Sequence, residues 1–293
     1  MINFGGLQQE FSNQENAGII IIPVPYDATS TWGKGADKGP DAVISASANM
    51  ELYDIETGTE VYKRGIYTDN PVTEKASPEQ MVKAVYSRIS GVLEKGKFPV
   101  LIGGEHSVSI GSIQAFARHY SGLSVLQLDA HSDLRDEYEG SSNNHACVMA
   151  RAREVAPVVQ VGIRSMDSEE LSAMDAGRVF FAHQINENDA WMDKAVSMLS
   201  DHVYVTIDLD VLDPSIMPST GTPEPGGMGW YQVLRFLERV IDRKKLVGFD
   251  VVELCPSPSA KAPDFLAAKL IYRLLSMQFR KADRIDRVKA FQT

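Results

Sequence analysis

The sequence predicts an α/β fold: a single three-layer α/β/α domain with a mostly parallel central sheet. Short apolar runs such as PVLIGG and VYVTID are typical of parallel strands buried on both faces. These runs alternate with longer helical patterns, as in right-handed βαβ units. The 293 residues contain no internal repeat and no low-complexity linker, so we expect one domain over residues 1–293.

The apolar runs and helical patterns define the expected elements in order. We expect strands at 18–22, 98–102, 124–129, 158–162, 179–182, 202–208 and 246–251. We expect helices at 77–95, 107–119, 168–176, 191–199, 229–242 and 264–280. The first helix has the clearest start, because Ser77, Pro78 and Gln80 form a capping-box pattern. Ligands of such sheets bind beyond the carboxyl ends of the strands, so residues that follow each apolar run are candidates for a site.

Composition excludes several classes of protein. Hydrophobic residues make up 44% of the chain and charged residues 23%, which are ordinary globular values. The net charge of -10 disfavours nucleic acid as a partner. No apolar run is long enough to span a membrane, and the N-terminal MINFGGLQQEFSNQ lacks the features of a signal peptide. Two cysteines cannot form a disulfide framework, so a cytoplasmic location fits best.

Carboxylates and imidazoles follow three of the expected strands. Asp129, His131 and Asp133 alternate at the end of SVLQLD and can converge on one point. Asp208 and Asp210 form a second alternating pair after HVYVTI, and His106 follows PVLIGG. An isolated Asp-x-Asp is usually a solvated turn, but three such motifs at strand ends favour a metal site.

The charge of these side chains predicts the number of metal ions. Four clustered aspartates would repel each other strongly without cations, and two divalent ions carry the matching charge. Carboxylate and imidazole ligands without thiolate suit Mn, Fe, Co, Ni or Zn in a catalytic role. Two such ions can share a water molecule and lower its pKa toward neutral. The sequence therefore predicts a two-metal hydrolytic centre.

Several segments together resemble the arginase and agmatinase family of manganese ureohydrolases, and specifically its agmatinase-like branch. They are GGEHS, DAHSDLRDEYEG, DLDVLDPS, TGTPEPGG, DVVELCP, PVPYDATSTWGKGADKGPDAV and QVGIRSMDSEE. The resemblance covers nearly the whole chain. It implies an arginase-like fold and hydrolysis of a guanidino group to urea and an amine.

The resemblance also implies roles for individual residues. The metal ligands would be His106, Asp129, His131, Asp133, Asp208 and Asp210, holding two Mn²⁺ per chain, with Ni²⁺, Co²⁺ or Fe²⁺ as other possible ions. Glu253 would pair with the substrate guanidinium, a task suited to a carboxylate. His145 would line the mouth of the site and relay protons. Asp133 would be both ligand and proton acceptor.

The sequence narrows the choice of guanidino substrate to a few compounds. After Asp133 the chain reads Leu134-Arg135-Asp136-Glu137, which is agmatinase-like and disfavours arginine. We expect agmatine, cleaved to putrescine and urea as in polyamine biosynthesis, with guanidinobutyrate or guanidine as alternatives. The segment CPSPSAKAPDF departs from the commoner agmatinase pattern, so the resemblance does not predict the local shape of the pocket wall.

Other interpretations are weaker. A two-metal phosphoesterase would need a basic cluster near the ligands, and none is evident. An inactive regulatory relative would be expected to have lost ligands, whereas all the positions are filled. Cys147 and Cys255 are interpreted as packed thiols rather than nucleophiles. The resemblance suggests a homo-oligomer, commonly a hexamer or trimer.

Overall fold

The computed structural model describes residues 2–290, and it describes the side chains of residues 2–280. Its sheet contains eight strands, all parallel, in the order β2-β1-β3-β8-β7-β4-β5-β6. The strands are β1 (Ile19–Val24), β2 (Ile66–Thr68), β3 (Phe98–Gly103), β4 (Leu123–Leu128), β5 (Val158–Ile163), β6 (Val179–Phe181), β7 (His202–Asp208) and β8 (Lys245–Val252). The predicted parallel sheet is confirmed.

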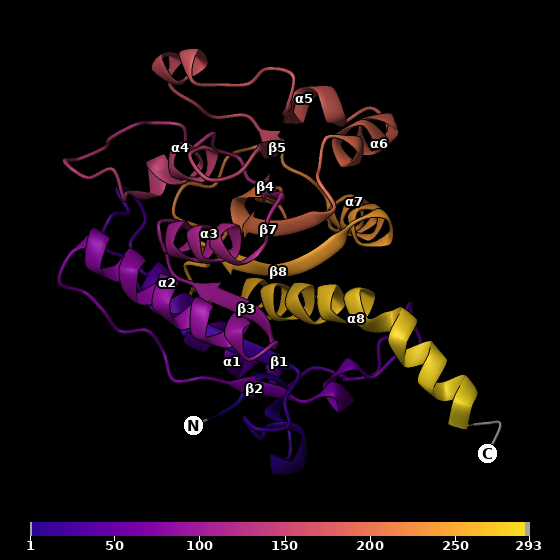
Figure 1. The fold of residues 1–293 in the computed structure, drawn as a ribbon. Coiled ribbons are helices and arrows are strands. Elements are labelled where there is room, and N and C mark those ends of the chain that lie inside the picture. The colour runs from indigo at the N-terminus through magenta and orange to yellow at the C-terminus, as the bar shows by residue number, and fades with distance from the viewer. Residues whose placement is uncertain (1, 291–293) are drawn as a thin grey trace.

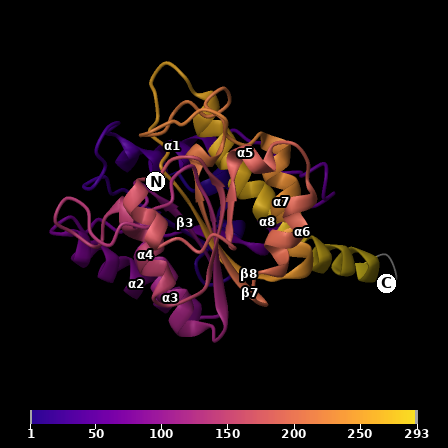
Figure 2. The same ribbon diagram turned by 90° about the horizontal axis from the view of Figure 1, so that it is seen from above.

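Helices cover both faces of the sheet (Figures 1 and 2). The α-helices are α1 (Gly39–Ser47), α2 (Pro78–Glu94), α3 (Val108–His119), α4 (Val148–Arg153), α5 (Ala182–Ile185), α6 (Ala190–Ser197), α7 (Trp230–Arg243) and α8 (Ala262–Ala290). Short 3-10 helices are η1 (Phe4–Gly6), η2 (Gln9–Phe11), η3 (Ala36–Lys38), η4 (Val61–Arg64), η5 (His145–Cys147), η6 (Ser168–Ser172) and η7 (Leu209–Val211). Helices α2, α3 and α4 lie on one face, and α1, α6, α7 and α8 lie on the other.

Two hydrophobic cores, one on each side of the sheet, explain the three layers. Along β1, Ile19 and Ile21 pack into one core, and Ile20 and Ile22 pack into the other. This division follows from the alternation of side chains along a strand. Burial of each such isoleucine contributes about 1.5–3 kcal/mol, so an unbroken apolar strand is stabilised from both faces. The predicted three-layer α/β/α architecture is confirmed.

The remaining differences from the prediction are local. The three-residue strand β2 and the helices α1, α4 and α5 were not predicted, because all are short and lack a distinctive pattern. The helix expected at 168–176 is only the 3-10 turn η6, which ends at Ser172. Asp175 ends this region in a turn, since its side chain accepts from the N–H of Gly177 and its carbonyl accepts from the N–H of Arg178. None of the described helices is long and apolar enough to cross a bilayer.

Candidate metal centre and active site

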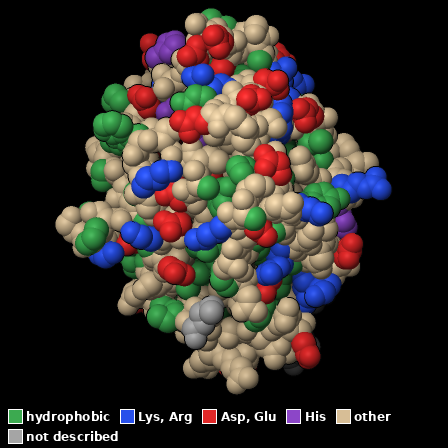
Figure 3. Space-filling model, turned by 90° about the vertical axis from the view of Figure 1, so that its left-hand side faces the viewer, with side chains coloured by type: hydrophobic (Ala, Val, Ile, Leu, Met, Phe, Trp, Pro, Cys, Tyr) green, Lys and Arg blue, Asp and Glu red, His purple; other side chains and the backbone are tan. Residues whose placement is uncertain are grey.

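The site lies where four neighbouring strands of the sheet end. Strands β3, β8, β7 and β4 are adjacent in the sheet. His106 follows β3, Glu253 follows β8, and Asp208 is the last residue of β7. Asp210 follows β7, and Asp129, His131 and Asp133 follow β4. Figure 3 shows the molecule from the side toward which the arrows of Figure 1 point, with acidic and basic side chains interspersed over this face. The predicted position at the carboxyl edge of the sheet follows the general rule for open α/β sheets.

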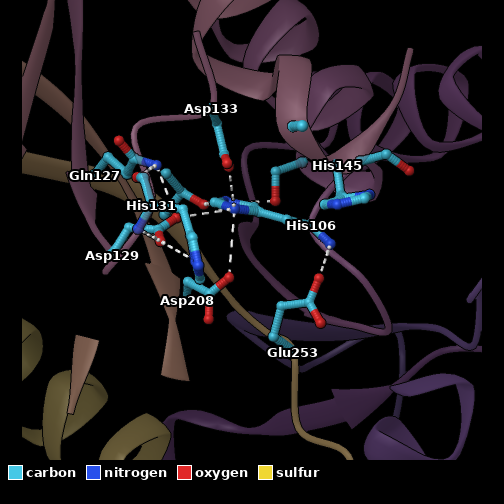
Figure 4. A network of polar contacts seen from close by, with 12 residues as sticks. His106, Gln127, Asp129, His131, Asp133, His145, Asp208 and Glu253 are labelled. Atoms are coloured by element: carbon cyan, nitrogen blue, oxygen red, sulfur yellow. Dashed lines mark hydrogen bonds and ion pairs between the residues drawn. The ribbon is translucent and has the colours of Figure 1, made fainter. Parts of the chain in front are cut away.

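A glycine turn places His106 beneath this edge. A side chain at Gly104 would bring its Cβ within 1.9 Å of the carbonyl oxygen of Tyr26, so only glycine fits there. The N–H of Gly104 donates to Val24, and the N–H of Glu105 donates to Tyr26. The chain is thereby held against the end of β1, and His106 is directed into the centre of the site (Figure 4).

His106 lies among three carboxylates. Its Nδ1 is 3.1 Å from an oxygen of Asp129, 3.0 Å from Asp133 and 3.6 Å from Asp208. All four side chains are buried. The ligand atoms of His106, Asp129 and Asp208 lie within 4.8 Å of one another, which is close enough for one metal ion to contact all three.

A second group lies beside the first and shares Asp129. His131 Nδ1 is 2.9 Å from Asp210 Oδ2 and 3.7 Å from Asp129 Oδ1. The ligand atoms of Asp129, His131 and Asp210 also lie within 4.8 Å of one another. Backbone bonds hold the carboxylates in place, because Asp210 accepts from the N–H of Ala130 and Asp208 accepts from the N–H of Asp210. The structure thus places five of the predicted ligand residues in two adjoining groups, with Asp133 beside His106.

The electrostatics show that this cluster is short of positive charge. Burial lowers the pKa of His131, but the carboxylates of Asp210 and Asp129 outweigh burial and raise that pKa to about 12. Burial and the charge of Asp129 raise the pKa of Asp133 to about 7. Burial and the neighbouring carboxylates also raise the pKa of Asp208 well above its ordinary value. These carboxylates cannot all be charged together unless cations lie among them.

The donor set fits divalent metal ions. Within the part of the chain that the structure describes, His106 Nδ1 is buried and has no hydrogen-bond partner, although it faces carboxylate oxygens. A cation between the imidazole and these oxygens would satisfy all of them at once. Imidazole and carboxylate without thiolate is a ligand set suited to catalytic first-row metals.

Glu253 reaches the same site from β8 in a left-handed backbone conformation. Its φ angle is +67°, and Asp133 has a φ of +52°, so both lie in a region that costs energy for residues other than glycine. Glu253 Oε1 accepts from the N–H of His106 at 2.7 Å, while the side chain lines the cavity. Burial and the charge of Glu105 raise the pKa of Glu253 well above its ordinary value. Glu253 is therefore a buried carboxylate that forms no ion pair with a lysine or arginine among the described residues.

His145 lines the same cavity but stands apart from the carboxylates. It lies in η5, its Nδ1 is 3.2 Å from the hydroxyl of Thr29, and its ring meets the ring of Tyr138 edge-on at 5.9 Å. Burial and then the nearby His106 and His131 lower the pKa of His145 to about 4. With a pKa of about 4, the imidazole of His145 is neutral at pH 7.

The cavity has a volume of about 300 Å³ and opens past a charged rim. Arg135 lies over the ring of Tyr138 at 4.8 Å and pairs with Asp167 at 3.2 Å. Thr31 and Thr222 complete the rim. The two cysteines are free thiols, Cys147 buried and Cys255 half-buried, and neither lines the cavity.

Sequence reasoning missed a layer of polar residues below the ligands. Gln127 donates to Asp129 at 2.7 Å, and Thr206 lies 2.8 Å from His106 Nε2. Each stands two positions before a ligand, inside an apolar run, and therefore on the same face of its strand. Asp250 is a third polar residue inside such a run. The signal that could have revealed these residues in the sequence is a polar side chain within an otherwise apolar strand.

Known proteins resemble this chain over most of its length. The model of the arginase family matches residues 17–276. An N(1)-aminopropylagmatine ureohydrolase from Synechocystis is 39% identical over 278 residues, covering 91% of each chain. An agmatinase from Pyrococcus horikoshii is 34% identical, covering 91% of this chain and 94% of its own. The agmatine ureohydrolase structure from Thermoplasma volcanium superposes with a TM-score of 0.85 at 30% identity, covering 97% of this chain and 95% of its own.

Proposed function

This chain belongs to the arginase family, and on that premise we propose that it hydrolyses a small cationic guanidino compound to urea and an amine. The observation that carries the proposal is the arrangement of Glu253 beside the two ligand groups in one cavity. A buried carboxylate that is not needed as a ligand is the group expected to bind a guanidinium.

The metal centre would be held by His106, Asp129, His131, Asp133, Asp208 and Asp210. When bound, two divalent ions would lower the pKa of a shared water molecule and so supply a hydroxide nucleophile at neutral pH. We propose Mn²⁺ as the ion, with Ni²⁺, Co²⁺ or Fe²⁺ as the alternatives to compare.

Glu253 would orient the guanidinium. One of its oxygens is occupied by the N–H of His106, which fixes the direction of the carboxylate toward the cavity. The other oxygen can accept from the substrate, and the negative charge offsets the positive charge of the guanidinium. The guanidinium carbon is thereby held in one orientation next to the ligand groups.

His145 and Asp133 would move protons. Asp133 lies within the cluster and can take a proton from the attacking water, while His145 at the cavity wall can pass a proton to the departing amine. The neutral imidazole of His145 both accepts and donates, and Thr29 orients its ring through Nδ1.

Agmatine is the substrate that we propose first, with putrescine and urea as products. The relatives named N(1)-aminopropylagmatine ureohydrolase make the aminopropyl derivative of agmatine the second candidate. Both carry a guanidinium at one end and a cationic chain at the other. Asp167 lines the cavity with 40% of its side chain exposed, so its carboxylate is open to that cationic chain.

Urea release across a panel of guanidino compounds tests the proposal. The panel contains agmatine, N(1)-aminopropylagmatine, guanidinobutyrate, guanidine and arginine, each with Mn²⁺, Ni²⁺, Co²⁺ or Fe²⁺. We expect the highest kcat/KM with agmatine or its aminopropyl derivative. Phosphate release from a generic ester without urea from any guanidine would favour a two-metal phosphoesterase instead. A protein that binds no metal and is inactive on both kinds of substrate would be a regulatory relative.

We propose further that residues 1–293 act as one ureohydrolase domain in a homo-oligomer, a hexamer or trimer, in the cytoplasm. The free thiols of Cys147 and Cys255 are compatible with a reducing compartment. Light scattering of the purified protein tests the assembly, and a monomer at micromolar concentration would contradict it.

A further inference from the structure

A chain of buried polar groups runs through the core beneath His106. Its members are Ser112 on α3, Tyr204 and Thr206 on β7, Asp250 on β8, and His106 itself. All are at most 1% exposed. Thr206 and Asp250 are directly paired positions of neighbouring strands, so the sheet register itself brings them together.

Asp250 lies at the centre of this chain. Its Oδ2 accepts from the hydroxyl of Tyr204 and its Oδ1 accepts from the hydroxyl of Thr206, each at 2.6 Å. A buried carboxylate is costly, and an apolar residue of similar volume would often stabilise the core as well or better. The cavity that holds substrate does not include Asp250. Its presence therefore calls for a role other than packing or contact with substrate.

The direction of the hydrogen bonds can be followed from Asp250 to the metal centre. The hydroxyl of Thr206 has one hydrogen and lies 2.6 Å from Asp250 Oδ1 but 3.5 Å from Ser109 Oγ, so it donates to Asp250. Its oxygen then has to act as an acceptor toward His106. His106 Nε2 lies 2.8 Å from that oxygen and must then be the nitrogen that carries hydrogen. In the neutral imidazole, the other nitrogen, Nδ1, then carries the lone pair and faces the carboxylates of Asp129 and Asp133. A neutral imidazole with a free lone pair on one nitrogen is the form of histidine that binds a metal ion.

We propose that Asp250 is a positioning residue which, through Thr206, holds His106 in the tautomer and orientation that binds metal. This inference rests on the proposed metal-dependent function, and it assigns a role to a side chain three positions before Glu253 that touches neither metal nor substrate. Groups that orient metal-binding histidines are worth about 10–100-fold in metal affinity. The effect should fall on the ion bound by His106 more than on the ion bound by His131.

Mn²⁺ affinity measured by chelator competition tests this assignment, with the melting temperature of the metal-free protein as a second readout. We expect Thr206→Val and Asp250→Asn each to weaken the binding of one Mn²⁺ by about 10–100-fold. Thr206→Ser keeps the hydroxyl and should bind within about threefold of wild type. Ser276→Ala, which removes an equally buried hydroxyl from α8, is the matched control and should not change Mn²⁺ affinity.

The double variant Thr206→Val/Asp250→Asn distinguishes a connected chain from two independent defects. If both residues act through one series of hydrogen bonds, breaking it twice has no added effect. The double variant should then bind Mn²⁺ as weakly as the more impaired single variant, and no more weakly. The proposal would be overturned if the losses of Mn²⁺ affinity in the two single variants multiplied in the double variant. It would also be overturned if Thr206→Val bound Mn²⁺ like wild type, or if Thr206→Ser lost as much affinity as Thr206→Val. If Asp250→Asn does not fold, the comparison of Thr206→Val with Thr206→Ser decides the question. A wild-type protein that binds no Mn²⁺ would instead refute the proposed function.

Discussion

Replacing Glu253 by glutamine should separate substrate orientation from metal binding. The amide oxygen of glutamine can still accept from the N–H of His106, so the side chain keeps its position. The other side of the amide then presents N–H groups to a guanidinium that also presents N–H groups. The variant therefore loses one charge-assisted hydrogen bond, worth about 1.5–3 kcal/mol. At about 1.4 kcal/mol per factor of ten, kcat/KM should fall by roughly 10- to 100-fold.

The same variant should keep its fold and its metal ions. Burial raises the pKa of Glu253, so a neutral amide removes a buried charge rather than a stabilising one, and the melting temperature should not fall. Urea release with agmatine, metal content after dialysis and thermal melting are measured together. Glu94→Gln, an exposed change at the end of α2, is the matched control for net charge. Normal turnover in Glu253→Gln, or loss of a metal ion, would show that Glu253 does not orient the substrate.

Three further predictions concern the metal centre and the fold. The purified protein should retain about two divalent ions per chain after gentle dialysis, as a two-metal site requires, and elemental analysis that finds one ion or none would contradict this. Asp210→Asn should stay folded but bind metal less tightly and release urea about 100-fold more slowly, with only partial rescue by excess Mn²⁺; two retained ions and full activity would identify Asp210 as an ordinary turn residue. Asp54→Asn should destabilise the protein at pH 7 by about 3 kcal/mol, because Asp54 is the buried partner of Arg273 on α8. Burial raises the pKa of Asp54, but hydrogen bonds from Arg273 and Thr57 outweigh it and lower that pKa below 3.8. The stabilisation is therefore complete above the unfolded pKa of about 3.9 and is lost as the pH falls through the lower folded value. Melting curves should show a difference between wild type and Asp54→Asn at pH 7 that shrinks toward pH 3, and a constant difference would refute the assignment.

The residue pattern alone predicted the layers of the fold and the grouping of the candidate metal ligands at one edge of the sheet. Alternation along β1 assigns Ile19 and Ile20 to opposite cores, and alternation after β4 assigns Asp129, His131 and Asp133 to one edge. Both follow from local geometry, since successive side chains of a strand point to opposite faces. Short elements such as β2 were missed because three residues carry no periodicity.

Only the tertiary structure decided which strands are neighbours. The sequence places β3, β4, β7 and β8 far apart, and the order of strands depends on long-range packing that no local pattern records. That order places His106 beside Asp208 and pairs Thr206 with Asp250. It also lets the N–H of His106 donate to Glu253. The sequence by itself therefore determined which residue types meet at the edge of the sheet. Their mutual distances, their burial and the hydrogen bonds beneath them came from strand order and register, because these contacts join segments up to about 150 residues apart.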